Sequence, residues 1–389
     1  MPASVTPITA ARPKVIEFFA GIGLARIGLE KAGFRVAWAN DYESDKEALY
    51  RSHFRDEELG NDHTFVLGDI NGIDAATLPK DAAMAWGSSP CTDLSLAGSR
   101  GGIRAGESNA FWGYIKLLKE VGEENRPPVV VLENVVGLAT SHGGDDIAAA
   151  IRAFNDLGYS VDVLALDARR FIPQSRPRLF LVGAQTTPAA AEHSSVLRPD
   201  YLSWIFADTT LRTHQAELPV PPEALSTGLD DYIETMPVAD ARWWDETRTA
   251  AFTNSLSPIQ SERVVRLRRA SGVTHRTAYR RTRNGVATWE VRADDISGCL
   301  RTARGGSSKQ VVVKVGNKRL QVRWMTPLEY ARLMGAGDYT LTSARTNQAL
   351  FAFGDAVAVP AVAWLSENYL MPLVKGKLDV HVELTASVK

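Results

Sequence analysis

One cysteine stands where a nucleophile could act. The stretch "GSSPCTDLSLAG" (87–98) places Cys91 directly after Pro90 and just past the apolar run "AAMAW", among small and hydroxyl residues. Cys91 and Cys299 are the only two cysteines in 389 residues, too few for a disulfide framework or a zinc cluster. Such a thiol is either a packing residue or a nucleophile that acts as the thiolate, and its place outside the apolar run favours the nucleophile.

Glycines and carboxylates at successive strand ends indicate a cofactor pocket. "EFFAGIGLARIGLE" places Gly21 and Gly23 in a turn between a strand and a helix, where the backbone can approach a ligand. Asp41 ends the next expected strand, where doubly wound folds bind ribose hydroxyls, and Tyr42 beside it can stack on a base. Asp69 ends the third strand. The turn alone could be structural, but three converging strand ends predict an adenosine pocket, and the missing third glycine favours S-adenosylmethionine over a nicotinamide dinucleotide.

The elements that position these residues alternate in the first half of the chain. Strands are predicted at 14–19, 35–40, 64–70, 82–87 and 128–135, with helices at 24–34, 44–54, 109–121 and 145–158. This alternation predicts an α/β fold with a mostly parallel sheet covered on both faces. The runs 160–168 and 176–184 follow each other too closely for a helical crossover, so an antiparallel pair is expected at the far side of the sheet.

The alternation stops near residue 186. Residues 187–260 are rich in Pro, Ala and Thr, and residues 261–323 hold 16 Lys and Arg against 4 Asp and Glu, a local charge of +12 in a chain of net charge −1. Such a block predicts a surface for a polyanion, although a solvated helix face followed by a polar hairpin is the plainer reading. Helices return at 325–335, where Thr326 and Pro327 form a capped start, and at 357–370.

The ordered motifs give a specific resemblance. "FAGIGLARIGLEKAGF", "ND", "GDI", "PCTDLS", "ENV", "QSRPRLF", "TPLEYARLMG" and "FGDAV" follow one another as in the DNA (cytosine-5)-methyltransferases of bacterial restriction–modification systems, over residues 15 to 360. The resemblance implies a Rossmann-like S-adenosylmethionine-dependent methyltransferase domain, whose sheet has an antiparallel edge, plus a smaller, irregular, β-rich target-recognition domain. We therefore predict a catalytic and cofactor domain at 1–186 plus 324–389, and a DNA-binding domain at 187–323.

The same resemblance implies roles for individual residues. Pro90 would hold Cys91 in a fixed direction. Cys91 would add as a thiolate to carbon 6 of cytosine, because carbon 5 is too weakly nucleophilic to attack a sulfonium methyl group unaided. Glu133 would hold the ring's N3 and amino group, Asn134 would organise that loop, and Arg176 and Arg178 would contact the base and orient the glutamate. The predicted cofactor-binding residues are Phe19, Gly21, Gly23, Asp41, Tyr42, Asp69, Ile70, Asp355 and Val357.

Contacts to DNA are expected from two glycine-rich segments. The target base must leave the duplex stack, which calls for a lid beside the nucleophile, and residues 96–106 fit that description. The phosphate-contact candidates are Ser95, Arg100, Arg104, Arg301, Arg304 and Lys309. Three features depart from the family's common pattern: Thr92 after the nucleophile, Asp355 where Asn is usual, and "ESNAFW" (107–112), where the family often has an Arg. Cys299 is expected to be a packed residue.

The chain is thus predicted to methylate carbon 5 of cytosine in double-stranded DNA, with S-adenosylmethionine as donor, S-adenosylhomocysteine as product and no metal. A tRNA cytosine methyltransferase, a catalytically inactive DNA-binding regulator and a nicotinamide oxidoreductase are the weaker alternatives. A cognate restriction endonuclease and a monomeric state are expected. The N-terminus lacks the apolar core of a signal peptide. No apolar run is expected to reach the ~18 residues that a membrane span needs. A cytoplasmic location without membrane association is therefore expected.

Overall fold

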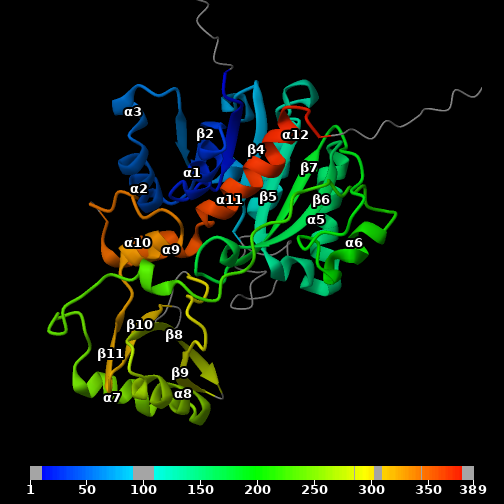
Figure 1. Cartoon of the computed structure of the whole chain (residues 1–389). Coiled ribbons are helices and arrows are strands. Elements are labelled where there is room, and N and C mark those ends of the chain that lie inside the picture. Colours follow the sequence, from blue (N-terminus) through cyan, green and yellow to red (C-terminus); the bar gives the residue numbers. More distant parts are fainter. Residues whose placement is uncertain (1–10, 91–108, 284, 302–308, 343, 379–389) are drawn as a thin grey trace, which may run out of the picture.

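The chain folds around two separate β-sheets (Figure 1). This computed structural model describes residues 11–90, 109–283, 285–301, 309–342 and 344–378. Within that part of the chain, a seven-stranded sheet has the order β3-β2-β1-β4-β5-β7-β6, and a four-stranded sheet has the order β11-β10-β8-β9. The first sheet is mostly parallel and the second antiparallel, which confirms the predicted fold class.

The larger sheet carries the predicted strand–helix alternation. Its strands are β1 (Lys14–Phe18), β2 (Arg35–Asp41), β3 (Thr64–Leu67), β4 (Ala82–Ser88), β5 (Val129–Val135), β6 (Ser160–Asp167) and β7 (Pro177–Ala184). Strands β1 to β5 pair in parallel, whereas β7 lies antiparallel between β5 and β6. The antiparallel pair at the far side of the sheet is therefore confirmed.

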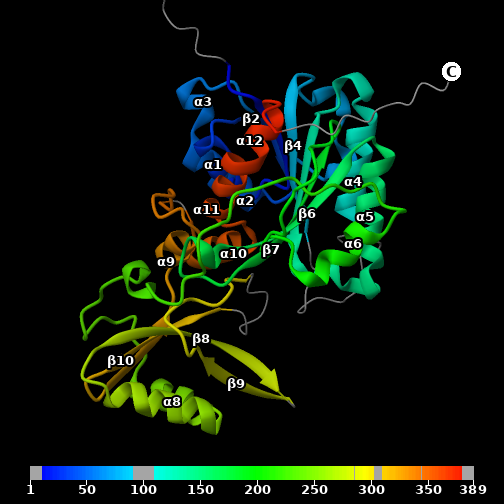
Figure 2. The same ribbon diagram turned by 45° about the vertical axis from the view of Figure 1, so that its right-hand side comes forward.

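Helices cover both faces of this sheet, so its central strands are apolar on both sides. On one face lie α1 (Leu24–Lys31), α2 (Ser44–Phe54) and α11 (Val359–Leu365), which share a core with Val15 and Val131. On the other lie α4 (Asn109–Glu120), α5 (Asp145–Asp156) and α6 (Ser203–Ala207), as Figure 2 shows. Two short helices, α3 (Asp56–Leu59) and α12 (Met371–Val374), complete this domain.

Two predicted elements end earlier than expected. The helix predicted at 24–34 ends at Lys31, because Gly33 takes a left-handed conformation (φ 95°) that turns the chain into β2. The strand predicted at 64–70 ends at Leu67, because the Asp69 side chain accepts a hydrogen bond from the Asn71 N–H and caps a 3₁₀ turn. In both cases a local turn motif ends the element.

The smaller sheet and two helices form a second core (Figure 2). Its strands are β8 (Thr274–Arg283), β9 (Val286–Val291), β10 (Val311–Gly316) and β11 (Arg319–Trp324). Helices α7 (Glu246–Asn254) and α8 (Pro258–Arg269) pack on one face of this sheet through Phe252 and Val264. The described part of the basic block thus consists of a helix and hairpins, and its role as a surface for a polyanion stays a prediction.

The chain returns to the larger domain through α9 (Pro327–Leu333). Thr326 accepts a hydrogen bond from the Glu329 N–H, and Glu329 accepts one from the Thr326 N–H, so the predicted capped start is confirmed. Helix α10 (Thr346–Asp355) follows, and α11 continues through a π-helical turn, Ser366–Leu370, into α12.

One helical stretch of the described chain, Thr346–Val374, meets the length and composition of a membrane span. It has 29 residues and a mean hydropathy of 1.6 over an 18-residue window, so the expectation that no apolar run approaches that length was wrong. However, 67% of that window is buried inside the protein, and the core helices of globular proteins pass the same test.

Residues that follow β7 pack on the outer edge of the large sheet. Arg198 forms an ion pair with the buried Asp162 of β6 (Nη2–Oδ2 2.6 Å), and His214 bonds to the Tyr369 hydroxyl (2.9 Å). Leu197 and Ala216 belong to the large domain's core. Arg198, His214 and Ala216 all fall inside the range 187–323 that was predicted to form the DNA-binding domain. That division of the chain stays a prediction.

Candidate active site

A carboxylate and a guanidinium form the centre of the site. Glu133 lies near the end of β5 and Arg178 near the start of β7, and antiparallel pairing brings the two strand ends together. Arg178 Nε lies 2.9 Å from Glu133 Oε1, and the side chains are only 14% and 9% exposed. A nearly dry, charge-assisted pair of this kind fixes the carboxylate's orientation. The structure thus brings Glu133 into contact with Arg178, one of the two arginines predicted to orient it.

The adjacent strand end leads to the nucleophile. Ser88 of β4 pairs with Glu133, and the Asn134 amide donates a hydrogen bond to the Ser89 carbonyl (3.5 Å). Asn134 also accepts from the Val135 N–H (2.8 Å), so its amide holds the chain immediately before Pro90. Cys91, Thr92, Ser95, Arg100 and Arg104 lie outside the described residues.

Arg176 binds the backbone of two other segments. Its side chain is 1% exposed and donates to the carbonyls of Leu300 (2.6 Å), Gly354 (3.0 Å) and Ala356. Its own N–H donates to Asp167 Oδ1 (2.7 Å). Through these hydrogen bonds, Arg176 connects β7 with the chain that leaves the smaller domain and with the α10–α11 connection. Its predicted contact with the target base stays a prediction.

A second thiol lies beside Arg176. Arg176 Nη1 lies 3.4 Å from Cys299 Sγ, and Cys299 is half-buried and free. Burial acts to raise the pKa of the Cys299 thiol, but Arg176, Arg178 and Arg301 outweigh it and leave the pKa below its ordinary value. The sequence offered no signal for the contact between Arg176 and Cys299, because the two residues are 123 positions apart.

The glycine turn after β1 has the backbone that the sequence predicts. Phe19, Gly21 and Gly23 all have positive φ angles (57°, 56° and 76°). A Cβ at Gly23 would lie 2.4 Å from the Phe54 ring, so only glycine fits there. The Gly21 N–H donates to Asp41 Oδ2 at 2.8 Å, which joins the turn to the end of β2.

The predicted cofactor carboxylates differ in their surroundings. Asp41 is 5% exposed; burial raises the pKa of its carboxyl group, and the charge of Lys46 and N–H groups from Glu43 and Gly21 only partly offset this. Tyr42 beside it is 53% exposed. Asp69 at the end of the neighbouring strand is exposed, while Ile70 is buried.

Lys46 is a site residue that the sequence reasoning missed. Its Nζ lies 2.9 Å from Glu43 Oε1 and 3.1 Å from Asp355 Oδ2, and its side chain is 13% exposed. Burial acts to lower the pKa of Lys46, but Asp355, Asp41 and Glu43 raise it above its ordinary value. Asp355, which departs from the family's common Asn, therefore has Lys46 as its ion-pair partner. This pair links α10 to α2. Val357, two residues on, is buried.

A second missed residue lies in β1, next to the turn. Glu17 is 1% exposed, and neither carboxyl oxygen has a hydrogen-bond partner among the described residues. Burial raises the pKa of Glu17 to about 8, so the carboxyl is mostly protonated at neutral pH. That value also reflects Arg26, which lowers the pKa, and the charges of Glu30 and Asp41, which raise it.

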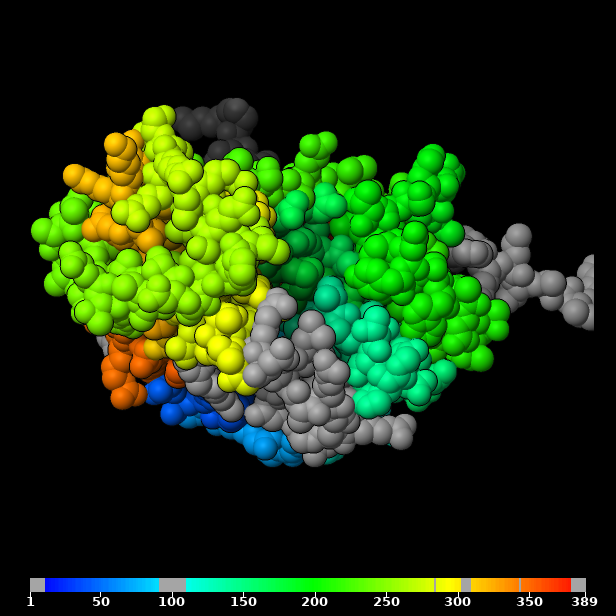
Figure 3. Space-filling view, turned by 90° about the horizontal axis from the view of Figure 1, so that it is seen from below, coloured from blue at the N-terminus to red at the C-terminus, as the bar shows by residue number. Residues whose placement is uncertain are grey.

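The predicted phosphate contacts in the described chain lie near the junction of the two domains. Arg301 is exposed, Lys309 Nζ donates to Asn347 Oδ1 (2.6 Å), and Arg304 lies outside the described residues. Figure 3 shows a recess between the yellow-green smaller domain and the green part of the larger domain. The site therefore combines the Glu133 carboxylate paired with Arg178, a glycine turn with nearby carboxylates, and a basic second domain.

Known proteins resemble this chain in sequence. A sequence model of the C-5 cytosine-specific DNA methylases matches residues 13–370. Type II methyltransferase M.Bsp6I from Bacillus sp. (strain RFL6) is 26% identical over 361 residues, 91% of this chain and 98% of that protein. Type II methyltransferase M1.ScrFI from Lactococcus lactis subsp. cremoris is 26% identical over 371 residues, 94% of this chain and 80% of that protein.

Solved structures share the fold. The S. pombe Dnmt2 methyltransferase superposes with a TM-score of 0.59 at 19% identity, covering 93% of this chain and 99% of that one. The Entamoeba histolytica methyltransferase EhMeth gives 0.56 at 14% identity, covering 94% and 98%. Because the ordered motifs, the fold and a family match over nearly the whole length agree, the chain belongs to the C-5 cytosine-specific DNA methylase family.

Proposed function

We propose that this chain transfers a methyl group from S-adenosylmethionine to carbon 5 of a cytosine in double-stranded DNA, by covalent attack of Cys91 on a base turned out of the helix. The observation that carries the proposal is the buried Glu133–Arg178 pair beside the strand end that leads to Pro90 and Cys91. By their likeness to this chain, the type II relatives further support a partner restriction endonuclease that cuts the same sequence.

The described residues fit the methyl donor. The turn at Gly21 is open apart from the Lys46 side chain, 4.0 Å from a Cβ built there, so a ligand can approach the backbone. Asp41 would hold the ribose hydroxyls, Tyr42 would stack on the adenine, and Asp355 would face the amino-acid end. When bound, this group supplies an electrophilic methyl on a sulfonium.

The protein's own groups would then act on the cytosine. The Cys91 thiolate forms a bond to carbon 6, which gives carbon 5 the electron density to take the methyl group. Glu133, oriented by Arg178, holds N3 and the amino group and supplies a proton to N3 as the thiolate adds. Transfer of the carbon-5 proton to water, return of the N3 proton to Glu133 and departure of the thiolate restore the aromatic ring. Turning the base out costs a few kcal/mol, which contacts from the smaller domain would offset.

The two cysteines provide a matched test. Purified protein should transfer labelled methyl groups from S-adenosylmethionine to DNA, and Cys91→Ala should abolish transfer, whereas Cys299→Ala should retain it. DNA that contains 5-fluorocytosine should trap a covalent adduct in the wild type and in Cys299→Ala only, because fluorine blocks the elimination. Transfer by Cys91→Ala would refute the mechanism, and transfer to tRNA but not to DNA would refute the substrate.

The Glu133 carboxylate gives an independent prediction. Glu133→Gln keeps the shape of the side chain but loses the proton donor and the ion pair with Arg178. We expect the rate of transfer to fall about 10²- to 10⁴-fold, the usual contribution of a general acid, while DNA affinity changes little. Single-turnover transfer and filter binding measure the two quantities. Bisulfite sequencing of DNA from expressing cells then identifies the methylated sequence.

A further inference from the structure

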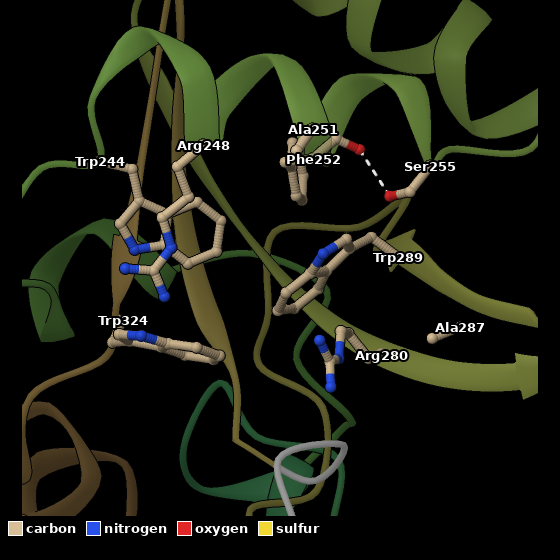
Figure 4. Close-up of a pocket in the computed structure, with 9 residues that line it drawn as sticks. All are labelled: Trp244, Arg248, Ala251, Phe252, Ser255, Arg280, Ala287, Trp289 and Trp324. Carbon is tan, nitrogen blue, oxygen red and sulfur yellow. Dashed lines mark hydrogen bonds between the residues drawn. The ribbon is translucent and has the colours of Figure 1, made fainter.

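A cavity in the smaller domain has no role in the proposed reaction. It measures about 270 Å³ and lies between α7 and the four-stranded sheet (Figure 4). Its lining comes from α7 and the residues around it, and from strands β8, β9 and β11: Trp244, Arg248, Ala251, Phe252, Ser255, Arg280, Ala287, Trp289 and Trp324. None of these residues was predicted to bind cofactor, cytosine or phosphate.

Three indole rings form most of the wall. The ring of Trp244 lies 5.4 Å from that of Trp324 and 5.8 Å from that of Trp289, with interplanar angles of 74° and 58°. The rings of Trp289 and Trp324 lie 5.9 Å apart at 52°. The rings meet at steep angles, and the Arg248 guanidinium lies over Trp324 (5.5 Å) as well as over Trp244, so the wall combines aromatic surface with a guanidinium plane. A flat aromatic ligand is the natural complement of such a surface.

The polar groups of the lining are almost all hydrogen-bond donors. The Arg248 guanidinium lies 4.2 Å from the Trp244 ring centre, and that of Arg280 lies 5.9 Å from the Trp289 ring centre. Within the described chain, the buried N–H groups of Trp244 Nε1 and Arg280 Nε have no hydrogen-bond partner. The lining's one hydroxyl, Ser255 Oγ, donates to the Phe252 carbonyl (2.7 Å). The pocket therefore calls for a ligand that brings acceptors and negative charge.

A closed hydrophobic core would not have this composition. Phe252 and Trp289 are 1% and 7% exposed, so they belong to the domain's core. Yet burying an N–H group without a partner is unfavourable, and few such groups occur in folded proteins. Two of them, beside two arginines and an open volume, distinguish this wall from a closed apolar core.

We propose that this pocket binds one unpaired nucleotide of a DNA strand, its base against the indole rings and its phosphate against Arg248 and Arg280. A nucleobase is flat and carries carbonyl acceptors, and a phosphate matches a guanidinium. The volume lies just under the range of about 300–1,000 Å³ for drug-sized ligands, so it suits a single base. The surrounding block 261–323, with its charge of +12, would attract the rest of the strand.

Binding is tested without reference to methyl transfer. Tryptophan fluorescence of the full chain is titrated at fixed salt with thymidine 5′-monophosphate and with the single strand (dT)₈. Both should quench saturably, and (dT)₈ should bind more tightly because its flanking phosphates contact the basic block. Arg280→Met should weaken both ligands by about tenfold, the loss of one charged contact near an aromatic wall.

Arg242→Met is the matched control. Arg242 lies in the same domain, is 54% exposed and pairs with Asp240 outside the cavity, so its loss changes the charge equally but leaves the pocket intact. Thermal melting checks that both variants fold. Equal weakening in the two variants, or no saturable quenching at all, would overturn the proposal, and binding of the mononucleotide but not of (dT)₈ would refute a DNA strand as the occupant.

The outcome is separable from that of the proposed function. Transfer to duplex DNA is measured on the same Arg280→Met protein. Loss of nucleotide quenching with transfer retained at saturating DNA supports a second site. Absence of transfer in the wild type would refute the proposed methyltransferase reaction. The quenching titration would still decide whether the cavity binds a nucleotide.

Discussion

At the scale of single residues, the ion pair between Lys46 and Asp355 explains how this chain tolerates an acid where its family has an amide. Lys46 also pairs with Glu43, and it moderates the pKa of Asp41. Without Lys46, the three neighbouring carboxylates of Asp41, Glu43 and Asp355 would repel one another.

Lys46→Met should therefore weaken the binding of S-adenosylmethionine about tenfold, or about 1.4 kcal/mol, as measured by calorimetry. Lys116→Met serves as the control, because Lys116 makes an exposed pair with Glu120 on α4 and such pairs contribute little. Unchanged affinity in Lys46→Met would show that the pair lies outside the cofactor's reach.

Glu17 predicts a pH dependence of stability at the same scale. Its pKa is about 8 in the folded protein and near 4.5 when the chain is unfolded, so between these values the folded state binds the extra proton. Stability is therefore full below about pH 4.5 and falls as the pH rises towards 8, by at most about 1.4 kcal/mol per pH unit.

Urea unfolding at pH 5, 6.5 and 8 measures this slope. Glu17→Gln has no proton to release, so its stability should vary less with pH. Its stability should exceed that of the wild type at pH 8. An identical slope in both proteins would mean that other groups, such as Asp41 with its own raised pKa, set the dependence.

At the scale of elements, the close contact between α1 and α11 fixes the helices around the cofactor turn. A Cβ on Gly28 would lie 2.7 Å from Val362 Cβ and 2.9 Å from the Val359 carbonyl, so the helices must separate to admit it. Gly28→Ala gains about 1 kcal/mol of helix propensity but loses about 1–3 kcal/mol to overpacking.

We expect a net loss of stability of about 1 kcal/mol by urea unfolding, together with weaker cofactor binding, because α11 follows Asp355 and Val357. Gly72→Ala is the control, since a Cβ there meets nothing within 4 Å and the residue has no positive φ. A Gly28→Ala protein more stable than the wild type would mean that the helices adjust freely.

Elements with strong periodicity were predictable, and those held by tertiary contacts were not. Helix α2 (44–54) and the β6–β7 pair followed from sequence pattern, because local propensity and burial agree there. Helix α7 and the course of residues 187–245 were missed, because their apolar residues are sparse and pack on distant partners, as Arg198 does on Asp162.

The candidate site divides in the same way. Motifs predicted that Arg178, with Arg176, would orient Glu133, because each residue type carries its chemistry within a short ordered block, and the structure shows the Arg178 contact. The contacts of Lys46 and Cys299 could not be predicted, because they join segments that only the fold brings together. Glu17 was passed over because its burial is a property of the packed sheet.

At the scale of the whole molecule, one buried ion pair joins the two domains. Arg323 at the end of β11 and Glu329 in α9 are both 0% exposed, with Nη1–Oε2 2.8 Å. Arg323 also donates to the Glu234 carbonyl (3.3 Å), while the Glu234 N–H donates to Glu329 (2.9 Å). The pair thus fixes the direction in which the smaller sheet leaves the catalytic domain.

Arg323→Met should cost about 3–5 kcal/mol in urea unfolding, because it leaves Glu329 buried without its counter-charge. The double variant Arg323→Met/Glu329→Leu should recover much of that stability, because removing both charges removes the desolvation penalty. If the pair also sets the domain angle, the recovered double variant should still bind duplex DNA more weakly than the wild type. A double variant as unstable as the single one would show that the hydrogen bonds to Glu234, rather than the charge balance, hold the junction together.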